Sequence, residues 1–253
     1  MEKRDLASAT TQPQEETGPL TVRSGFMLKV LYALCALVLV SGAISLAGRH
    51  AGQFIAMAGH TDDSSLREIV IGNDVLHVPA NMIRFEAARR DGVSNRLDLY
   101  LRWPRMDGYS HAASDAFNHV DGDRSILFLS FEPRMMSRDM SGRFEPIYRL
   151  LIEEETRPGP AGLRVHRFSE SSGYVDEVLV VAEREDGGEP FVMRCLAGAA
   201  AREALAPCER DIHVGDGLNL VYRMPSRLAG EWRAVEARVR EVAEGFLRTG
   251  KTR

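Results

Sequence analysis

Hydrophobic residues are most concentrated near the N-terminus of the chain. From Val30 to Gly48 the sequence reads VLYALCALVLVSGAISLAG, without a charged residue. As an α-helix this segment is about 28 Å long, close to the ~30 Å hydrocarbon core of a bilayer. A helix in a soluble core normally has a polar face, and the polar groups here are only Ser41, Ser45 and the Tyr32 hydroxyl. The pattern predicts one transmembrane helix, and no second segment of this length follows.

This helix has two interpretations, an uncleaved membrane anchor or a secretory signal peptide. Ser45-Leu46-Ala47 has the small residues of a cleavage site, which leaves cleavage open. The segment before the helix is long for a signal peptide, however, and apolar residues continue at helical spacing beyond Gly48, as in a stalk. We therefore favour an anchor and expect residues 25–59 to form a transmembrane helix and a helical stalk.

The polar N-terminal segment bears on the topology. Residues 1–24 lack apolar periodicity and are expected to form a disordered cytoplasmic tail. Basic residues on the two sides of the helix are nearly balanced, and Lys3 and Arg4 tip the count towards a cytoplasmic N-terminus. The sequence therefore predicts a single-pass protein of a bacterial inner membrane, with its C-terminal domain, residues 66–253, in the periplasm.

Short apolar segments typical of strands dominate this domain. Arg96–Trp103 alternates polar and apolar residues, and Ser125–Phe131 is apolar nearly throughout, so we expect a central strand there. Turn-forming triplets at Gly72-Asn73-Asp74 and Gly215-Asp216-Gly217 predict two hairpins. The other predicted strands are Leu66–Ile71, Val75–Val78, Leu163–Phe168, Glu177–Ala182, Pro190–Leu196, Asp211–Val214 and Leu218–Tyr222.

Helical periodicity appears in two parts of the domain. In Ser141–Glu155, apolar residues recur every three or four positions, and Pro146 fits a first helical turn. Ser226–Thr249 has the same spacing, with Ser226 as the expected N-cap. Strands and helices do not alternate regularly. The fold class predicted is therefore α+β: a transmembrane helix, then a strand-rich, mostly antiparallel domain with a C-terminal helix.

Composition narrows the classes of protein further. Of 253 residues, 44% are hydrophobic and 27% charged, which excludes collagen-like, disordered and polytopic membrane proteins. The formal net charge is −4, which gives no electrostatic reason to expect a nucleic acid as partner. We expect the partners to be the membrane and an envelope protein or cell-wall component.

The cysteines indicate a compartment. Cys35 lies in the apolar helix, which leaves Cys195 and Cys208 as a pair at the ends of two predicted strands. A structural disulfide between them predicts an oxidising compartment such as the periplasm. Two unrelated reduced thiols are the alternative. Zinc and redox-active sites would need closer spacing of the two cysteines.

One cluster of residues raises the possibility of catalysis. His111, Asp115 and His119 are spaced i, i+4, i+8, so on a helix they would line one face and meet a divalent metal. With such a metal site the protein would be a metal-assisted envelope hydrolase, which is the alternative hypothesis for its function. The simpler interpretation is that these residues lie in an exposed loop. The serine of Gly108-Tyr109-Ser110-His111-Ala112 approximates a nucleophile elbow, but no strand leads directly into it. We expect no cofactor and no catalytic residue.

Two further segments offer surfaces for binding. The arginine-rich stretch from Asn81 to Arg96 is expected to be a mixed, solvated surface, because acidic residues offset much of its charge. Glu132–Arg143 contains three methionines and three arginines directly after a predicted strand. This segment either presents a partner-binding surface or packs its methionines into the core.

Several motifs resemble a family of single-pass, membrane-anchored proteobacterial proteins without a known activity. The motifs are VPANMIRF (Val78–Phe85), LDLYLRWP (Leu97–Pro104), MSRDMSGRFEPIYRLL (Met136–Leu151) and CERDI (Cys208–Ile212). The resemblance implies the anchored topology and no mechanism. The function predicted is thus that of a membrane-anchored binding or scaffolding protein, and a non-enzymatic role is favoured.

Overall fold

The computed structural model describes residues 24–57, 59–119 and 125–249 in two units, Met1–Ala58 and Gly59–Arg253. The first unit contains α1, a helix of 34 residues from Ser24 to Met57. Within it, Met27–Ser45 is long and apolar enough to cross a membrane, and none of this stretch is buried inside the protein. The tail predicted at residues 1–24 lies, apart from Ser24, outside the described residues.

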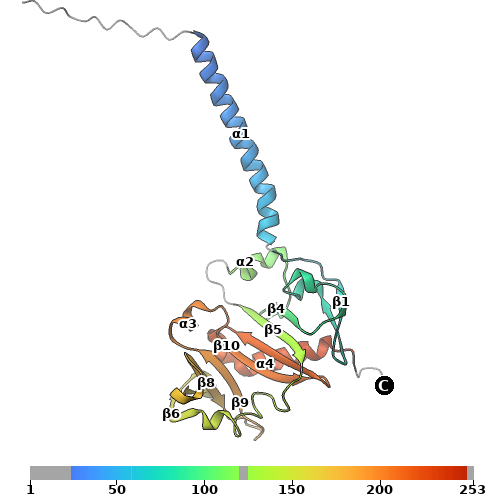
Figure 1. The fold of residues 1–253 in the computed structure, drawn as a ribbon, viewed down its shortest axis with the longest axis vertical. Coiled ribbons are helices and arrows are strands. Elements are labelled where there is room, and N and C mark those ends of the chain that lie inside the picture. The colour runs from blue at the N-terminus through green and yellow to red at the C-terminus, as the bar shows by residue number, and fades with distance from the viewer. Residues whose placement is uncertain (1–23, 58, 120–124, 250–253) are drawn as a thin grey trace, which may run out of the picture. The chain divides into compact units, whose positions relative to one another are not determined.

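The second unit is built on an antiparallel sheet of eight strands in the order β4-β5-β11-β10-β9-β8-β7-β6 (Figure 1). The strands are β4 (Leu97–Arg102), β5 (Ile126–Pro133), β6 (Ile152–Pro158), β7 (Arg164–Phe168), β8 (Glu177–Ala182), β9 (Phe191–Leu196), β10 (Cys208–Val214) and β11 (Leu218–Met224). The predicted strands are confirmed, including β5, which has a neighbour on each side.

A small sheet adjoins the large one, in the order β2-β1-β3. Its strands are β1 (Leu66–Ile71), β2 (Asp74–Pro79) and β3 (Gly92–Val93). The two hairpins predicted from their turn triplets are confirmed as β1–β2 and β10–β11. The helices of this unit are α2 (Ser114–Phe117), α3 (Gly198–Glu203) and α4 (Trp232–Phe246), with 3-10 turns η1 (Ala80–Met82), η2 (Glu86–Ala88), η3 (His111–Ala113), η5 (Tyr148–Leu150), η6 (Pro160–Gly162), η7 (Glu170–Ser172) and η8 (Ser226–Glu231).

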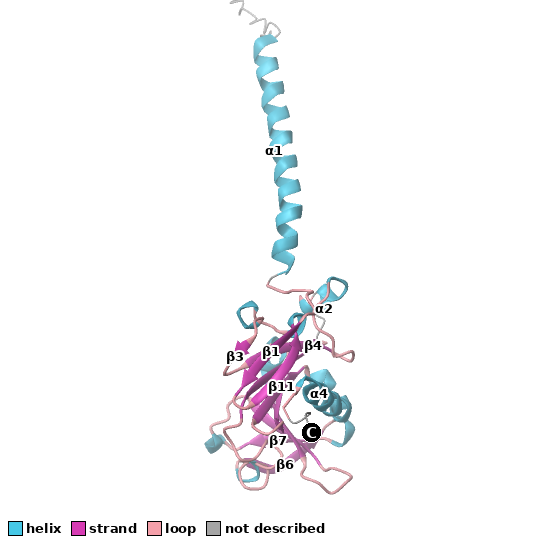
Figure 2. Cartoon of the chain, turned by 90° about the vertical axis from the view of Figure 1, so that its right-hand side faces the viewer, coloured by secondary structure: helices cyan, strands magenta, loops and turns pink. Residues whose placement is uncertain are grey.

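Helix α4 covers one face of the large sheet and closes the main core (Figure 2). Its apolar stripe includes Trp232, Val235 and Val239, all buried against strand residues of both sheets. Burial of each such side chain stabilises the fold by about 1.5–3 kcal/mol. The predicted C-terminal helix is thus confirmed, although Ser226 begins the 3-10 turn η8 and does not cap α4.

A second core lies on the opposite face of the sheet, at its β6–β9 end. It contains Met140, Tyr148, Phe168, Leu179, Val181 and Val192. The helix predicted for Ser141–Glu155 is wrong: the segment turns irregularly, forms η5, and enters β6 at Ile152. Of its apolar stripe Tyr148 is buried and Phe144, Leu151 and Ile152 are partly buried, whereas Ile147 is 38% exposed. Pairing of β6 with β7 determines the conformation of its C-terminal part.

Candidate functional site

A hollow of about 380 Å³ opens where this second core ends, beside β10 and β11. Along β10, Arg210 and Ile212 face α4, so the alternating residues Glu209 and Asp211 face the hollow. Met135 and Met136, from the segment after β5, form part of its rim. We call this the open-face hollow, because α4 covers the other face of the sheet.

Two ion pairs line the open-face hollow. Arg194 on β9 donates to Glu209 with an Nη2–Oε1 distance of 2.8 Å, and it lies 3.5 Å from Glu177. Arg143 forms the corresponding pair with Asp211. Because Glu209 and Asp211 are two residues apart on one strand, the two pairs lie side by side.

Each of these guanidinium groups also lies over a tyrosine ring. Arg194 is 5.2 Å from the ring centroid of Tyr174, and Arg143 is 5.9 Å from that of Tyr148. A carboxylate and an aromatic face therefore hold each arginine, which restricts its rotamers. The hollow consequently presents preorganised charged and aromatic groups.

Burial and charge shift the pKa values of these groups in different directions. Burial raises the pKa of Asp211, and the charge of Asp139 adds to this, while Arg143 opposes it. Burial alone would lower the pKa of Arg194, but Glu177 and Glu209 outweigh it and raise that pKa. With Glu132, the lining has three carboxylates against two arginines. The hollow is therefore complementary to a basic group.

The rim of the open-face hollow is apolar and exposed. Met135 is 90% and Met136 50% exposed, whereas Met140 is buried in the second core. Arg134 fixes the start of the segment, because its backbone N–H donates to Gly217 O and its guanidinium to Asp216 O. The Glu132–Arg143 segment thus packs Met140 into the core and leaves Met135 and Met136 exposed to solvent, while partner binding by this segment stays a prediction.

The structure does not bring the predicted metal-ligating residues together on a helix. His111 begins the 3-10 turn η3, Asp115 lies in the four-residue helix α2, and His119 follows it with a positive φ of 55°. Because α2 ends at Phe117, His111, Asp115 and His119 do not line one helical face, which was the arrangement that the alternative hypothesis of a metal site needed. His111 lies 3.2 Å from Asp62 instead. Within residues 24–57, 59–119 and 125–249, no three His, Cys, Asp or Glu side chains form a group suited to a metal.

The segment around Ser110 has no elbow geometry. Between β4 and Ser110 the chain makes a turn closed by a bridge from Arg102 to Asp107, and a 3-10 turn follows the serine. Gly108 is packed tightly there, since a Cβ would lie 2.6 Å from Asn81 O. The glycine therefore serves close backbone packing.

The arginine-rich stretch is engaged in contacts within the domain. Arg84 lies 4.9 Å from the centroid of the Phe128 ring, and Arg89 donates to Ile83 O. Arg96 donates to both carboxylate oxygens of Asp98, at 2.9 and 3.0 Å. These contacts fit the mixed surface expected from the sequence.

Cys195 and Cys208 form a disulfide, as predicted. They are direct partners in the register of β9 and β10, and their Cα atoms are 4.0 Å apart. The intervening residues form α3 and its flanking turns. Cys35 in α1 is a free cysteine.

No protein-family model and no curated protein sequence matches the chain. Two solved structures resemble it at 12% sequence identity. One is an immunity protein of the Stenotrophomonas maltophilia type IV secretion system, with a TM-score of 0.48, covering 74% of this chain and 94% of that protein. The other is the iron-regulated outer membrane lipoprotein FrpD of Neisseria meningitidis, with a TM-score of 0.45, covering 75% and 96%. At these TM-scores neither likeness bears on the function of this chain.

Proposed function

We propose that the chain is a single-pass inner-membrane protein that displays a partner-binding domain in the periplasm. In this proposal residues 1–24 form a cytoplasmic tail, residues 25–59 the anchor and stalk, and residues 66–253 the periplasmic domain. The observation that carries the location is the combination of α1 with the Cys195–Cys208 disulfide. An apolar helix of this length suits a bilayer, and a structural disulfide persists in an oxidising compartment.

Thiol labelling in intact cells tests the location. With Cys35 replaced by serine, we expect a membrane-impermeant maleimide to label Cys195 and Cys208 only after reduction, with the inner membrane intact. Labelling as free thiols, and only after the inner membrane is breached, would reverse the orientation and remove the argument from the disulfide.

The open-face hollow supports the binding role. Its exposed methionine rim suits apolar side chains, and its excess of carboxylates suits a basic residue. We assign it to a segment of an envelope protein that carries an apolar side chain next to an arginine or lysine. The basic residue of such a segment would contact tyrosine rings and carboxylates in the hollow, as Arg143 and Arg194 already do.

Photo-crosslinking in intact cells tests this role. A photoreactive amino acid at Met135 is expected to give a discrete adduct that disappears when Tyr174 is replaced by alanine. The matched control places the same group at Val93, which is 83% exposed and lies on β3, outside the hollow. Equal adducts at Met135 and Val93, or no adduct at Met135, would argue against the hollow as the binding site.

A further inference from the structure

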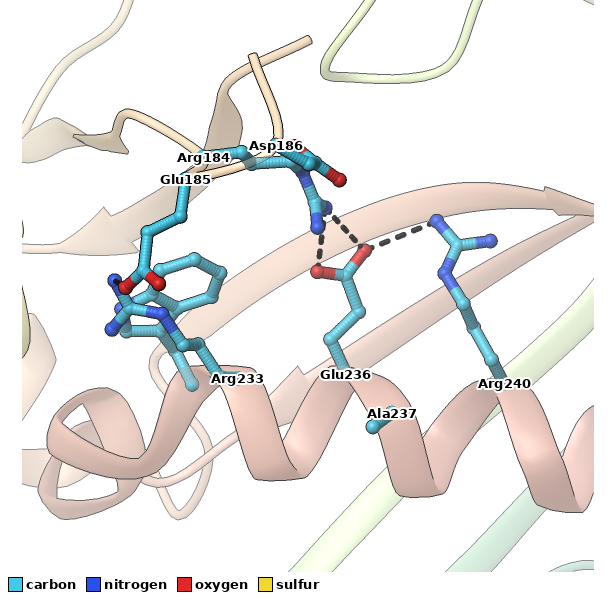
Figure 3. Close-up of a pocket in the computed structure, with 8 residues that line it drawn as sticks. Arg184, Glu185, Asp186, Arg233, Glu236, Ala237 and Arg240 are labelled. Carbon is cyan, nitrogen blue, oxygen red and sulfur yellow. Dashed lines mark hydrogen bonds and ion pairs between the residues drawn. The ribbon is translucent and has the colours of Figure 1, made fainter. Parts of the chain in front are cut away.

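A second hollow lies between helix α4 and the turn that joins β8 to β9 (Figure 3). Its volume is about 430 Å³. Arg184 enters it from the turn, while Arg233, Glu236 and Arg240 enter it from α4. Ala237 on α4 also belongs to the lining. We call this the α4 hollow.

One carboxylate in the α4 hollow accepts hydrogen bonds from three arginines. Arg184 Nη2 lies 2.9 and 2.7 Å from the two oxygens of Glu236, and Arg240 Nη2 lies 3.0 Å from Oε1. The buried Arg210 donates to the same Oε1 at 3.1 Å. Three positive charges therefore surround one negative charge.

Glu236 stays ionised in this environment. Burial alone would raise its pKa, but the charges of Arg210, Arg184 and Arg240 outweigh burial and lower the pKa below its ordinary value. The carboxylate therefore contributes a full negative charge, and the cluster retains an excess of two positive charges. Excess charge at a partly desolvated place favours binding of an anion.

A purely structural role explains Arg210 but not the other two arginines. Arg210 is 1% exposed, and it also donates to Val192 O and to Ser141 Oγ, so it fixes α4 to the sheet. The side chains of Arg184 and Arg240 are 27% and 38% exposed and line the hollow. One ion pair would hold the helix without them.

Donor groups of these two arginines remain available. Arg240 donates through Nη2 to Glu236, and its Nε and Nη1 donate to no residue in the described part of the chain. Arg184 donates through Nε to Glu189 O and through Nη2 to Glu236, while Nη1 donates to no described residue. Because both arginines reach Glu236 Oε1, a single small anion is able to bridge them.

Two further carboxylates, Glu185 and Asp186, line the hollow, but among the described residues neither pairs with Arg184 or Arg240. Glu185 lies 3.5 Å from Arg233 and is 89% exposed, and Asp186 accepts the backbone N–H of Gly188. Arg233 itself lies 4.4 Å from the centroid of the Trp232 ring and donates to Ala161 O. Arg233 and Glu185 therefore form their own ion pair at the edge of the hollow.

We propose that the α4 hollow binds a phosphate group between Arg184 and Arg240. The planar guanidinium groups match tetrahedral oxyanions through paired N–H donors, and the unused N–H groups of Arg184 and Arg240 are the donors that a phosphate would accept from. The group comes either from free phosphate or from a glycerophosphate of a lipid or envelope polymer. The site lies on the opposite face of the sheet from the open-face hollow, so it is independent of the proposed function.

The test uses the full chain purified in detergent and inorganic phosphate as the probe. We expect saturable binding by calorimetry and a rise in the thermal unfolding midpoint that chloride at equal ionic strength does not produce. Arg240→Gln is expected to weaken phosphate binding tenfold or more, because a charge-assisted contact is lost. Arg238→Gln is the matched control, since its side chain is on the same helix and 40% exposed, and pairs with Glu241 outside the hollow.

Glu236→Gln distinguishes binding from structure. It keeps the shape of the side chain but removes the charge that competes with phosphate. If the cluster is only structural, the variant loses stability whether or not phosphate is present. The proposal predicts tighter phosphate binding in Glu236→Gln and a thermal midpoint that phosphate raises more than in the unmodified chain.

The proposal is overturned if phosphate raises the midpoint no more than chloride in both the unmodified chain and Glu236→Gln. It is also overturned if Arg240→Gln and Arg238→Gln bind phosphate equally. A parallel titration with glycerol 3-phosphate identifies the source. Tighter binding than inorganic phosphate assigns the site to a glycerophosphate group, and weaker binding assigns it to free phosphate, and both outcomes support the site.

Discussion

Arg210 on β10 and Glu236 on α4 form an ion pair of 3.1 Å although both residues are almost fully buried, at 1% and 3% exposure. Such a pair connects the C-terminal helix to the sheet in one orientation. Without Arg210, the Glu236 carboxylate would still pair with Arg184 and Arg240. Without Glu236, Arg210 would lose the carboxylate with which it pairs. The two residues therefore contribute unequally to stability.

Removal of either charge is expected to destabilise the domain, and removal of the carboxylate more so. Glu236→Leu leaves Arg210 buried without a counter-charge, at a cost of about 3–5 kcal/mol. Arg210→Met leaves Glu236 paired with Arg184 and Arg240, so we expect a smaller loss. Denaturant unfolding of the full chain measures both values. Equal losses would show that the additional arginines do not stabilise the carboxylate.

The turn between β10 and β11 gives a second prediction. Gly215 has a φ of +58°, and a Cβ there would lie 2.8 Å from Asp74 Oδ1. The Asp74 carboxylate accepts the backbone N–H of Gly217 at 3.0 Å, so it connects the small sheet to this turn. We expect Gly215→Ala to cost about 2–3 kcal/mol, from backbone strain and displacement of Asp74.

Gly72 provides the matched control for this substitution. It has the same φ of +58°, but apart from its chain neighbours no described residue has an atom within 4 Å of the Cβ position. Gly72→Ala therefore carries only the backbone strain, about 1 kcal/mol. If the two substitutions lower the unfolding free energy equally, contact with Asp74 contributes nothing to the role of Gly215.

The strands and hairpins were predictable because their signals are local. Alternation at Arg96–Trp103 and the triplet Gly215-Asp216-Gly217 describe the chain within a few residues, and the structure matches both. The helix predicted at Ser141–Glu155 failed for the opposite reason. Its apolar spacing fits a helix, but β6 pairs with β7, a neighbour that the segment itself does not reveal.

The α4 hollow was missed because its residues come from separate parts of the sequence. Arg184, Arg210 and Glu236 lie on a turn, a strand and a helix. A signal was nevertheless present: Arg210 falls between Cys208 and Ile212 on the inward face of its strand, and Glu236 falls in the apolar stripe of α4. Two opposite charges at inward positions predict a buried pair, though not the further arginines that surround it.

The disulfide gives a third prediction. It joins residues 13 apart in sequence, a loop for which the chain-entropy model gives about 3 kcal/mol of stabilisation. We expect Cys195→Ser combined with Cys208→Ser to lower the free energy of unfolding by about this amount. Cys35→Ser is the control, because Cys35 is free and lies in α1. A double variant as stable as the control would assign the disulfide a role other than stability.

The last prediction concerns His60, whose ring stacks on Tyr109 with centroids 4.7 Å apart. Its Nδ1 lies 3.0 Å from the hydroxyl of Tyr100. Burial lowers the pKa of His60, and the charges of Arg89 and His119 lower it further, against a hydrogen bond with Asn118. The folded protein therefore binds this proton less readily than the unfolded chain, whose histidine pKa is about 6.5.

The contribution of neutral His60 to the free energy of unfolding is therefore fully present above pH 6.5, the ordinary pKa of histidine. It is lost as the pH falls through the lower pKa of the folded state. We expect the thermal unfolding midpoint to fall on acidification below about pH 6.5. His60→Phe keeps an aromatic ring against Tyr109 but does not titrate, so it should flatten this fall. Burial also lowers the pKa of His166, which leaves part of the slope in the variant. An unchanged slope in His60→Phe would show that protonation of His60 does not destabilise the fold.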